Sequence, residues 1–235
     1  ERTLAIIISQ SGETLDTMAA LREAKSLGAR ILSIVNVVGS SIARESDDVL
    51  YTWAGPEIAV ATTKAYSTQM AVLNMLGLYF GDILGTIDRE TYSEMVRDLQ
   101  RVPEYIEKIL ESAESIHEIA KKICRSEDVF FIGRNLDYAL SLEGSLKLKE
   151  ISYIHSEAYA SGELKHGTIS LIVDGTLVIA LGTYGPLFDK AMSNVVEVQA
   201  RGAQVLALTT ESHAGEMSKR VPMLMTIPDT EEMLL

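Results

Sequence analysis

The chain has 235 residues, of which 47% are hydrophobic, and 33 acidic against 21 basic side chains give it a net charge of −12. This length can hold one large domain or two of about 100 residues each, and the acidic balance, with no run of Lys or Arg, argues against nucleic acid as a partner. The single cysteine, Cys124, excludes a disulfide within the chain and fits a reducing compartment, and without a signal peptide or an apolar run long enough to span a bilayer we expect a cytoplasmic protein with no membrane partner.

The first predicted elements are an apolar strand over residues 4–8, a turn reading Ser-Gln-Ser-Gly-Glu-Thr over residues 9–14, and a helix over residues 15–27. A turn between a parallel strand and a helix directs backbone N–H groups and hydroxyls at whatever lies above it. An ordinary helix cap also favours Ser and Thr, but four hydrogen-bonding side chains around one glycine exceed what a cap needs. The turn is therefore predicted to bind a phosphate or phosphosugar, through Ser9, Gln10, Ser11 and Thr14.

A long helix is predicted next, over residues 60–81, followed by a charged, helix-periodic segment over residues 89–124 that Pro103 is expected to interrupt. Beyond it comes an apolar strand at residues 129–132, and after a short turn a helix over residues 138–152. Because Gly and Ser are scarce between residues 89 and 124, we expect connecting helices there and not a flexible linker.

The first strand–turn–helix–strand unit recurs later in the chain. Residues 6–8 match residues 179–181 at an offset of 173, which becomes 174 after the helix, where residues 31–34 match residues 205–208. The offset of 174 also aligns residues 49–52 with residues 223–226. A register kept over about 50 residues indicates an internal duplication. In both copies, alternating strands and helices predict a parallel sheet covered on both faces, hence an α/β fold with three layers per domain.

These patterns predict a first domain over residues 1–88, connecting helices over residues 89–124 and a second domain over residues 125–235. The strand and helix at residues 129–152 have no counterpart in the first copy. The chain also begins at Glu1 and not at Met. We therefore expect the natural protein to extend beyond both ends.

The duplication provides an internal comparison for the turn. In the second copy it reads Gly-Thr-Tyr-Gly-Pro-Leu over residues 182–187, so that Thr183 keeps one hydroxyl, Tyr184 adds a phenol and Pro186 removes an N–H donor. A turn needed only to cap a helix would keep a comparable set of hydroxyls. The ligand site is therefore predicted in the first copy, with another task for the second.

A second group of candidate residues lies in residues 143–167. On a helix, Glu143, Lys147 and Glu150 share one face, and a Gly-Glu-Leu-Lys-His-Gly loop follows with His166. A carboxylate can move a proton at a carbon next to a carbonyl, and a histidine can protonate or deprotonate a ring oxygen. These are the two proton transfers of an aldose–ketose isomerisation, although a solvated helix face with ordinary ion pairs also fits the pattern.

Four segments, residues 9–14, 57–66, 143–155 and 157–167, together resemble the isomerase half of the glutamine–fructose-6-phosphate aminotransferase family, which is built from tandem sugar isomerase (SIS) domains. The resemblance runs along essentially the whole chain. The phosphate turn is typical of SIS domains in general. The Lys-Leu-Lys-Glu-Ile-Ser-Tyr-Ile-His and Gly-Glu-Leu-Lys-His-Gly segments are typical of this family.

The resemblance implies roles for individual residues. Glu150 is implied as the base that moves the proton between C1 and C2, with Lys147 close by. His166 is implied to assist ring opening from the neighbouring subunit, which makes a homodimer with a shared site part of the mechanism. The sugar phosphate, its hydroxyls and the sugar itself are implied to contact Ser9, Gln10, Ser11, Thr14, Val60 and Thr62, the last standing where many relatives have Ser.

The family also has an N-terminal glutaminase domain and a C-terminal tail whose lysine forms a Schiff base with the sugar, and neither is in this sequence. We therefore expect an incomplete site, belonging to an enzyme that converts fructose 6-phosphate and glutamine to glucosamine 6-phosphate and glutamate. The alternatives are an SIS phosphosugar isomerase or deglycase without a glutaminase, and a sugar-phosphate-binding regulatory module. No cofactor and no metal are predicted, because the four histidines show no ligand spacing.

Overall fold

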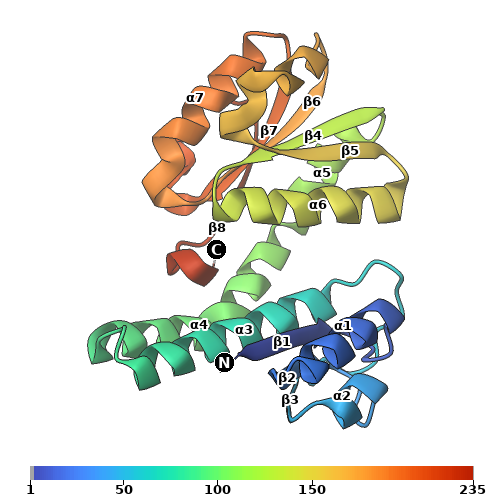
Figure 1. The fold of residues 1–235 in the computed structure, drawn as a ribbon. Coiled ribbons are helices and arrows are strands. Elements are labelled where there is room, and N and C mark those ends of the chain that lie inside the picture. The colour runs from blue at the N-terminus through green and yellow to red at the C-terminus, as the bar shows by residue number, and fades with distance from the viewer. Residues whose placement is uncertain (1–2, 235) are drawn as a thin grey trace. The chain divides into compact units, whose positions relative to one another are not determined.

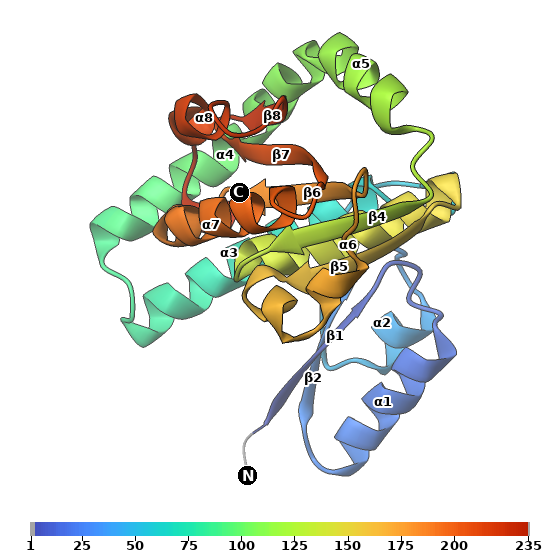
Figure 2. The ribbon, with the colours of Figure 1, turned by 90° about the horizontal axis from the view of Figure 1, so that it is seen from above.

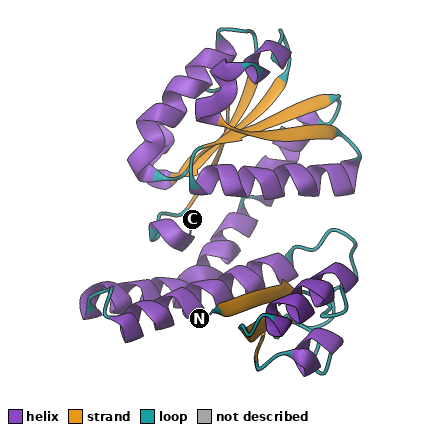
Figure 3. Ribbon diagram, in the orientation of Figure 1, coloured by secondary structure: helices purple, strands orange, loops and turns teal. Residues whose placement is uncertain are grey.

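The computed structural model describes residues 3–234. It divides into two compact units, of which unit 1 ends at Ser93 and unit 2 begins at Glu94. Each unit contains one parallel sheet with flanking helices (Figures 1 and 3), which confirms the predicted α/β class. The finer division into residues 1–88, 89–124 and 125–235 stays a prediction.

Unit 1 holds a three-stranded sheet of order β1-β2-β3. Its elements are β1 (Leu4–Ser9), α1 (Leu15–Ser26), β2 (Arg30–Val35), α2 (Ser41–Glu45), β3 (Asp48–Tyr51) and α3 (Lys64–Leu84). α1 and α2 cover one face of the sheet, where the buried core consists of Met18, Leu21, Ile31, Val35, Ile42 and Ala43. Burial of apolar side chains between helices and sheet is the main stabilising contribution here.

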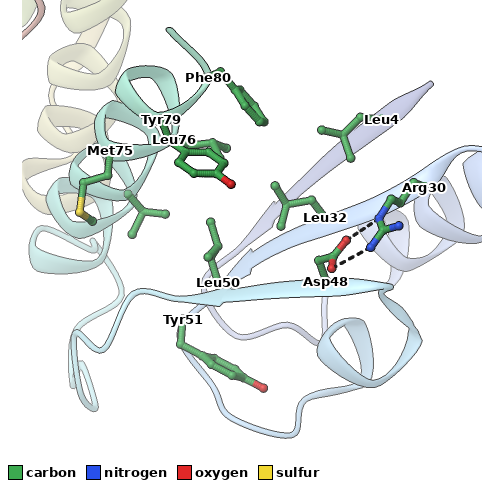
Figure 4. Close-up of a pocket in the computed structure, with 11 residues that line it drawn as sticks. Leu4, Arg30, Leu32, Asp48, Leu50, Tyr51, Met75, Leu76, Tyr79 and Phe80 are labelled. Carbon is green, nitrogen blue, oxygen red and sulfur yellow. Dashed lines mark hydrogen bonds and ion pairs between the residues drawn. The ribbon is translucent and has the colours of Figure 1, made fainter. Parts of the chain in front are cut away.

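The opposite face of the same sheet meets α3 across an apolar hollow of about 710 Å³ (Figure 4). Arg30 and Asp48 lie at its edge, with Arg30 Nε donating to Asp48 Oδ2 at 2.7 Å. Strands and helix contribute Leu4, Leu32, Leu50, Met75, Leu76, Tyr79 and Phe80 to its wall. None of the predicted site residues lines this hollow.

Unit 2 holds a five-stranded sheet of order β5-β4-β6-β7-β8 (Figure 2). Its strands are β4 (Asp128–Gly133), β5 (His155–Ala160), β6 (Leu177–Gly182), β7 (Gln204–Thr210) and β8 (Met223–Ile227). Its helices are α5 (Ala113–Ile123), α6 (Leu136–Ser152), α7 (Phe188–Gln199) and α8 (Glu211–Met217), with 3₁₀ segments η1 (Ser161–His166), η2 (Thr168–Leu171), η3 (Gly185–Leu187) and η4 (Glu232–Leu234).

Helices cover both faces of the unit 2 sheet. On one face α7 contributes Phe188, Met192, Val195 and Val198 to the larger core. On the other face α5 and α6 contribute Ile119, Ile123, Leu140 and Leu148 to a second core. This is the three-layer arrangement that a parallel sheet requires.

The internal duplication is visible in the order β1-α1-β2-α2-β3, which β6-α7-β7-α8-β8 repeats. Ser9 pairs with Val35 and Gly182 with Thr209, in agreement with the predicted offsets of 173 and 174. The third strand differs by one residue, because Leu32 pairs with Asp48 whereas Leu206 pairs with Met223, an offset of 175.

The predicted alignment of residues 49–52 with residues 223–226 was therefore wrong by one position. Packing agrees, since Val49 contacts the core beneath α1 and Leu224, its counterpart at 175, contacts the core beneath α7. A slip of one residue moves a strand's side chains to the opposite face. Sequence similarity alone did not reveal the extra residue, because both faces of a covered parallel strand are apolar.

The segment between the copies is helical, as predicted, but Pro103 does not interrupt it. α4 (Arg89–Glu111) runs through Pro103, and the break comes at Ser112, before α5. A proline inside a helix removes one N–H donor. No residue of α4 is buried, so water can take the place of the missing donor. Within residues 3–234, no helix has both the length and the apolar character needed to cross a bilayer.

Candidate functional site

The turn that follows β1 is folded by its own hydroxyls. Ser9 is buried, and its Oγ accepts the Gly12 N–H at 3.0 Å and lies 3.3 Å from Thr14 Oγ1. Ser11 Oγ accepts the Glu13 N–H at 3.2 Å. Three of the four predicted phosphate-binding side chains thus belong to one hydrogen-bonded turn.

None of these hydroxyls caps α1. Thr14 occupies the N-cap position, yet its side chain makes no capping hydrogen bond. The hydrogen bonds among residues 3–234 also include none from the backbone N–H of Gln10 or Ser11. The turn and the start of α1 therefore keep donors without an acceptor among the described residues, and unpaired N–H groups at a helix N-terminus are what anions bind.

Contacts with α2 hold the turn rigid. Gly12 has φ +68°, and a Cβ at this position would lie 2.1 Å from Ser40 Oγ, so a larger residue is excluded for two reasons. Glu13 Oε1 accepts the Ser41 N–H at 2.8 Å, and this bond lowers the pKa of Glu13. The Gly12 carbonyl accepts the Ile42 N–H at 3.0 Å.

Asn36, at the end of β2, links the turn to the segment after β3. Its backbone N–H donates to the Gln10 carbonyl at 3.1 Å. Its side-chain Oδ1 accepts the Ala54 N–H at 2.9 Å, and its Nδ2 donates to the Gly55 carbonyl at 2.8 Å. Between these contacts Trp53 adopts φ +54°, which is uncommon for a bulky residue. This linking role of Asn36 was not predicted from the sequence.

Val60 and Thr62 lie in an irregular loop, and not in the long helix that was predicted to begin at Val60. Val60 is 95% exposed and Thr62 is half-buried. Glu57 defines the helix start instead, because its Oε1 accepts the Thr63 N–H at 2.9 Å and its Oε2 the Ala65 N–H at 3.2 Å. The Thr63 bond is the largest cause that lowers the pKa of Glu57. Sequence reasoning gave Glu57 no such role, since no capping motif has this spacing.

In unit 2, Lys147 and Glu150 form an ion pair on α6. Lys147 Nζ lies 2.6 Å from Glu150 Oε2 and 3.6 Å from Glu143 Oε1, and all three side chains are partly buried. The hydrogen bond with Glu150 is the main cause that raises the pKa of Lys147. Lys147 is therefore an ammonium group at neutral pH, directly beside the candidate base.

His166 lies at the end of η1, exposed to solvent, with Nδ1 2.7 Å from Glu163 Oε2. Among the described residues it makes no hydrogen bond with Lys147 or Glu150. The turn and the loop with Val60 belong to unit 1, whereas Lys147, Glu150 and His166 belong to unit 2. The described part of the chain holds no group of three or more His, Cys, Asp or Glu suited to a metal ion.

The second copy's turn is occupied by a side chain that sequence reasoning missed. Asp137, in the first turn of α6, is 2% exposed and accepts hydrogen bonds from Thr183 and Tyr184. Burial raises the pKa of Asp137, opposed by these hydrogen bonds. An Asp in the first turn of a helix is common, because its negative charge stabilises the positive end of the helix dipole. The sequence alone therefore gave no sign that Asp137 reaches the end of another strand.

Comparison with known proteins identifies relatives over the whole chain. The SIS domain family matches residues 1–79 and 122–229. The glutamine–fructose-6-phosphate aminotransferase of Clostridium tetani is 56% identical over 229 residues, covering 97% of this chain and 38% of that protein. The same enzyme of Clostridium acetobutylicum is 52% identical over 235 residues, covering 100% and 38%. The chain therefore spans 38% of the length of these curated relatives.

Among solved structures, the C-terminal domain of glucosamine–fructose-6-phosphate aminotransferase from Francisella tularensis superposes with a TM-score of 0.94 at 34% identity. The match covers 98% of this chain and 65% of that one. These comparisons confirm the resemblance to the aminotransferase family. The roles of the individual site residues stay predictions.

Proposed function

The chain belongs to the SIS domain family, and we propose that it is the sugar-phosphate isomerase part of a glutamine–fructose-6-phosphate aminotransferase. The observation that carries this proposal is the identity of 52–56% with such enzymes over 97–100% of the chain. The hydroxyl turn and the Lys147–Glu150 pair support it with the two chemical requirements of the reaction, an anion site and a base.

The substrate is fructose 6-phosphate, held at its phosphate end by the turn after β1. The unpaired N–H groups of the turn and of the α1 start suit a dianion, which a protein of net negative charge cannot attract by long-range charge. Hydrogen bonds to phosphate and sugar hydroxyls come from Ser9, Gln10, Ser11 and Thr14, and Val60 and Thr62 line the sugar.

Glu150 takes a proton from one of the sugar carbons C1 and C2 and returns it to the other. Lys147 stays protonated because its pKa is raised, so it offsets negative charge that develops on the sugar next to Glu150. His166, from the neighbouring subunit of a homodimer, assists ring opening. Ammonia comes from glutamine at a glutaminase domain of the same polypeptide, and the products are glucosamine 6-phosphate and glutamate.

The test is a Glu150→Gln substitution in the complete parent protein, assayed with fructose 6-phosphate and glutamine. We expect formation of glucosamine 6-phosphate to fall by about 10²- to 10⁴-fold, because a general base is lost. Calorimetry is expected to show that fructose 6-phosphate binding is kept. Glu127→Gln, the same chemical change at an exposed position before β4, serves as the control and is expected to leave turnover unchanged.

The assay also separates the alternatives. Unchanged turnover in Glu150→Gln would show that this residue is not the base. A wild-type parent that isomerises the sugar phosphate but forms no amino sugar would be a phosphosugar isomerase. A parent that binds fructose 6-phosphate without converting it would be a regulatory module, which needs the turn but neither Glu150 nor His166.

A further inference from the structure

The two copies of the turn occupy equivalent places, so their backbone donors can be compared directly. The offset of 173 residues holds from β1 and β6 to the first residues of α1 and α7. Gln10 and Ser11 in the first copy thus correspond to Thr183 and Tyr184 in the second. None of the hydrogen bonds among residues 3–234 has the N–H of Gln10 or Ser11 as its donor, whereas the N–H groups of Thr183 and Tyr184 both donate. The acceptor in the second copy comes from the β4–α6 segment, which has no counterpart ahead of β1 in this sequence.

The acceptor in the second copy is the carboxylate of Asp137. The Thr183 N–H donates to Oδ2 at 3.1 Å and its hydroxyl to Oδ1 at 2.5 Å, while the Tyr184 N–H donates to Oδ2 at 3.2 Å. Thr183 is itself only 4% exposed. Both carboxylate oxygens therefore lie in a buried pocket of donors at the end of β6.

The backbone between β4 and α6 brings Asp137 to this place. A Cβ at Gly133 would lie 2.4 Å from the Asp137 carbonyl carbon, so the close approach requires glycine. Asn135 has φ +53°, an uncommon conformation for a residue with a side chain. Unusual backbone of this kind persists only where surrounding contacts support it.

The donors around Asp137 are neutral. The interactions that act on its carboxylate are hydrogen bonds from Thr183 and Tyr184, with no Lys or Arg charge among them. Two backbone N–H groups and one hydroxyl converging on a single anion is the pattern of an oxyanion or phosphate site. An ordinary ion pair would instead place a cationic side chain opposite the carboxylate.

We propose that the second turn is an anion site with a permanent, self-supplied ligand, the carboxylate of Asp137. This carboxylate takes the position that an external anion would take at the first turn, and it closes the second turn to phosphosugars. If the Asp137 side chain were removed, the emptied site would accept one small monoanionic carboxylate of the size of formate. Asp137 also joins the start of α6, the helix of Lys147 and Glu150, to the end of β6.

The test is chemical rescue of Asp137→Ala in this chain with sodium formate, since alanine plus formate replaces the atoms of the aspartate side chain. In sodium chloride, Asp137→Ala is expected to lower Tm by roughly 5–10 °C through loss of three buried hydrogen bonds. Formate at the same salt concentration is expected to raise Tm in a saturable manner, by more than it raises that of the wild type.

Two variants serve as matched controls. Asp137→Asn keeps the site filled, and we expect formate to bind it at least about tenfold more weakly than Asp137→Ala. Asp137→Ala combined with Thr183→Val lacks the hydroxyl donor and is expected to lose most of the formate response. If Asp137→Ala does not fold in chloride, the recovery of folded protein on refolding in formate replaces Tm as the readout.

A folded Asp137→Ala protein whose Tm responds to formate no more than the wild type would overturn the proposal. Equal rescue of Asp137→Asn, or no recovery of folding in formate, would overturn it as well. Neither fructose 6-phosphate nor Glu150 takes part in these measurements, so their outcome is independent of the sugar reaction.

Discussion

Ser33 lies at the centre of β2 with no exposed surface, and its hydroxyl has no hydrogen-bond partner among the described residues. At the equivalent position of the second copy, Ala207 is equally buried in β7. A buried hydroxyl without a partner loses its bonds to water on folding and gains nothing in return. The first copy therefore contains a local source of instability that the second lacks.

We expect Ser33→Ala to increase the free energy of unfolding by about 1–3 kcal/mol. Urea or thermal unfolding of this chain measures the change. Ala207→Ser is the reciprocal control and should lower the free energy of unfolding by a similar amount. A loss of stability in Ser33→Ala would mean that the hydroxyl has a partner, for example a bound water.

At the scale of single residues, the sequence predicted the turn correctly, because its hydrogen bonds join residues close in the chain, while its ligand-binding role stays a prediction. Ser9, Ser11 and Thr14 are neighbours in the chain, and their hydroxyls do form one turn. The roles of Asp137 and Glu57 were not predictable. Asp137 bonds to a residue 46 positions away, and no spacing rule connects two such residues before the sheet has formed.

Among the elements, α3 depends on a carboxylate outside the helix. Glu57 accepts N–H groups of Thr63 and Ala65, and its pKa is lowered in the folded protein. A lowered folded pKa means that this stabilisation is complete above the unfolded pKa and is lost as the pH falls through the folded one. Acidification should therefore loosen the start of α3 and the loop with Val60 and Thr62.

We expect the Thr63 amide signal, followed by NMR, to titrate with a midpoint below the ordinary pKa of Glu. Glu57→Gln should abolish this titration and speed hydrogen exchange at Thr63. Asp88 provides the matched control, because its Oδ1 accepts the Thr91 N–H at 2.9 Å at the start of α4 and its pKa is also lowered. Asp88→Asn should change Thr91 alone. A Thr63 titration that survives in Glu57→Gln would contradict the capping role.

The sequence predicted most elements well, and its errors have physical causes. The first helix was expected over residues 15–27 and runs from Leu15 to Ser26, because apolar periodicity and its ends were both clear. Pro103 suggested an interruption, but a helix without buried residues tolerates one missing hydrogen bond. The second copy has one additional residue before its third strand, which shifts the alignment of that strand by one position. Hydrophobic patterns did not reveal this shift, because both faces of the strand are apolar.

At the scale of the whole molecule, the duplication made the architecture predictable. Two copies of one strand–helix unit implied two parallel sheets, and both are present, one in each unit. The sequence resemblance, in turn, predicted that Glu150 and His166 serve one site from different subunits of a homodimer. This last prediction concerns the assembly of two subunits, and it needs an experiment on the dimer.

We expect mixed dimers to reveal a shared site. When parent subunits with Glu150→Gln and with His166→Ala are combined and allowed to exchange, mixed dimers contain one site with both defects and one with neither. Statistical mixing should restore about one quarter of wild-type turnover, because half of the dimers are mixed. Turnover equal to the sum of the two separate variants would show instead that each subunit carries a complete pair.

The carboxylate in the second turn also bears on how a duplicated protein diverges. Because Asp137 satisfies the donors of Thr183 and Tyr184 from within the chain, the second turn needs none of the hydroxyls with which the first turn is proposed to hold an external ligand. Gly182 has a separate reason, since a Cβ at this position would lie 3.0 Å from Met217 Cε. Mutation of the single codon for Asp137 would again expose the donors that both copies inherited.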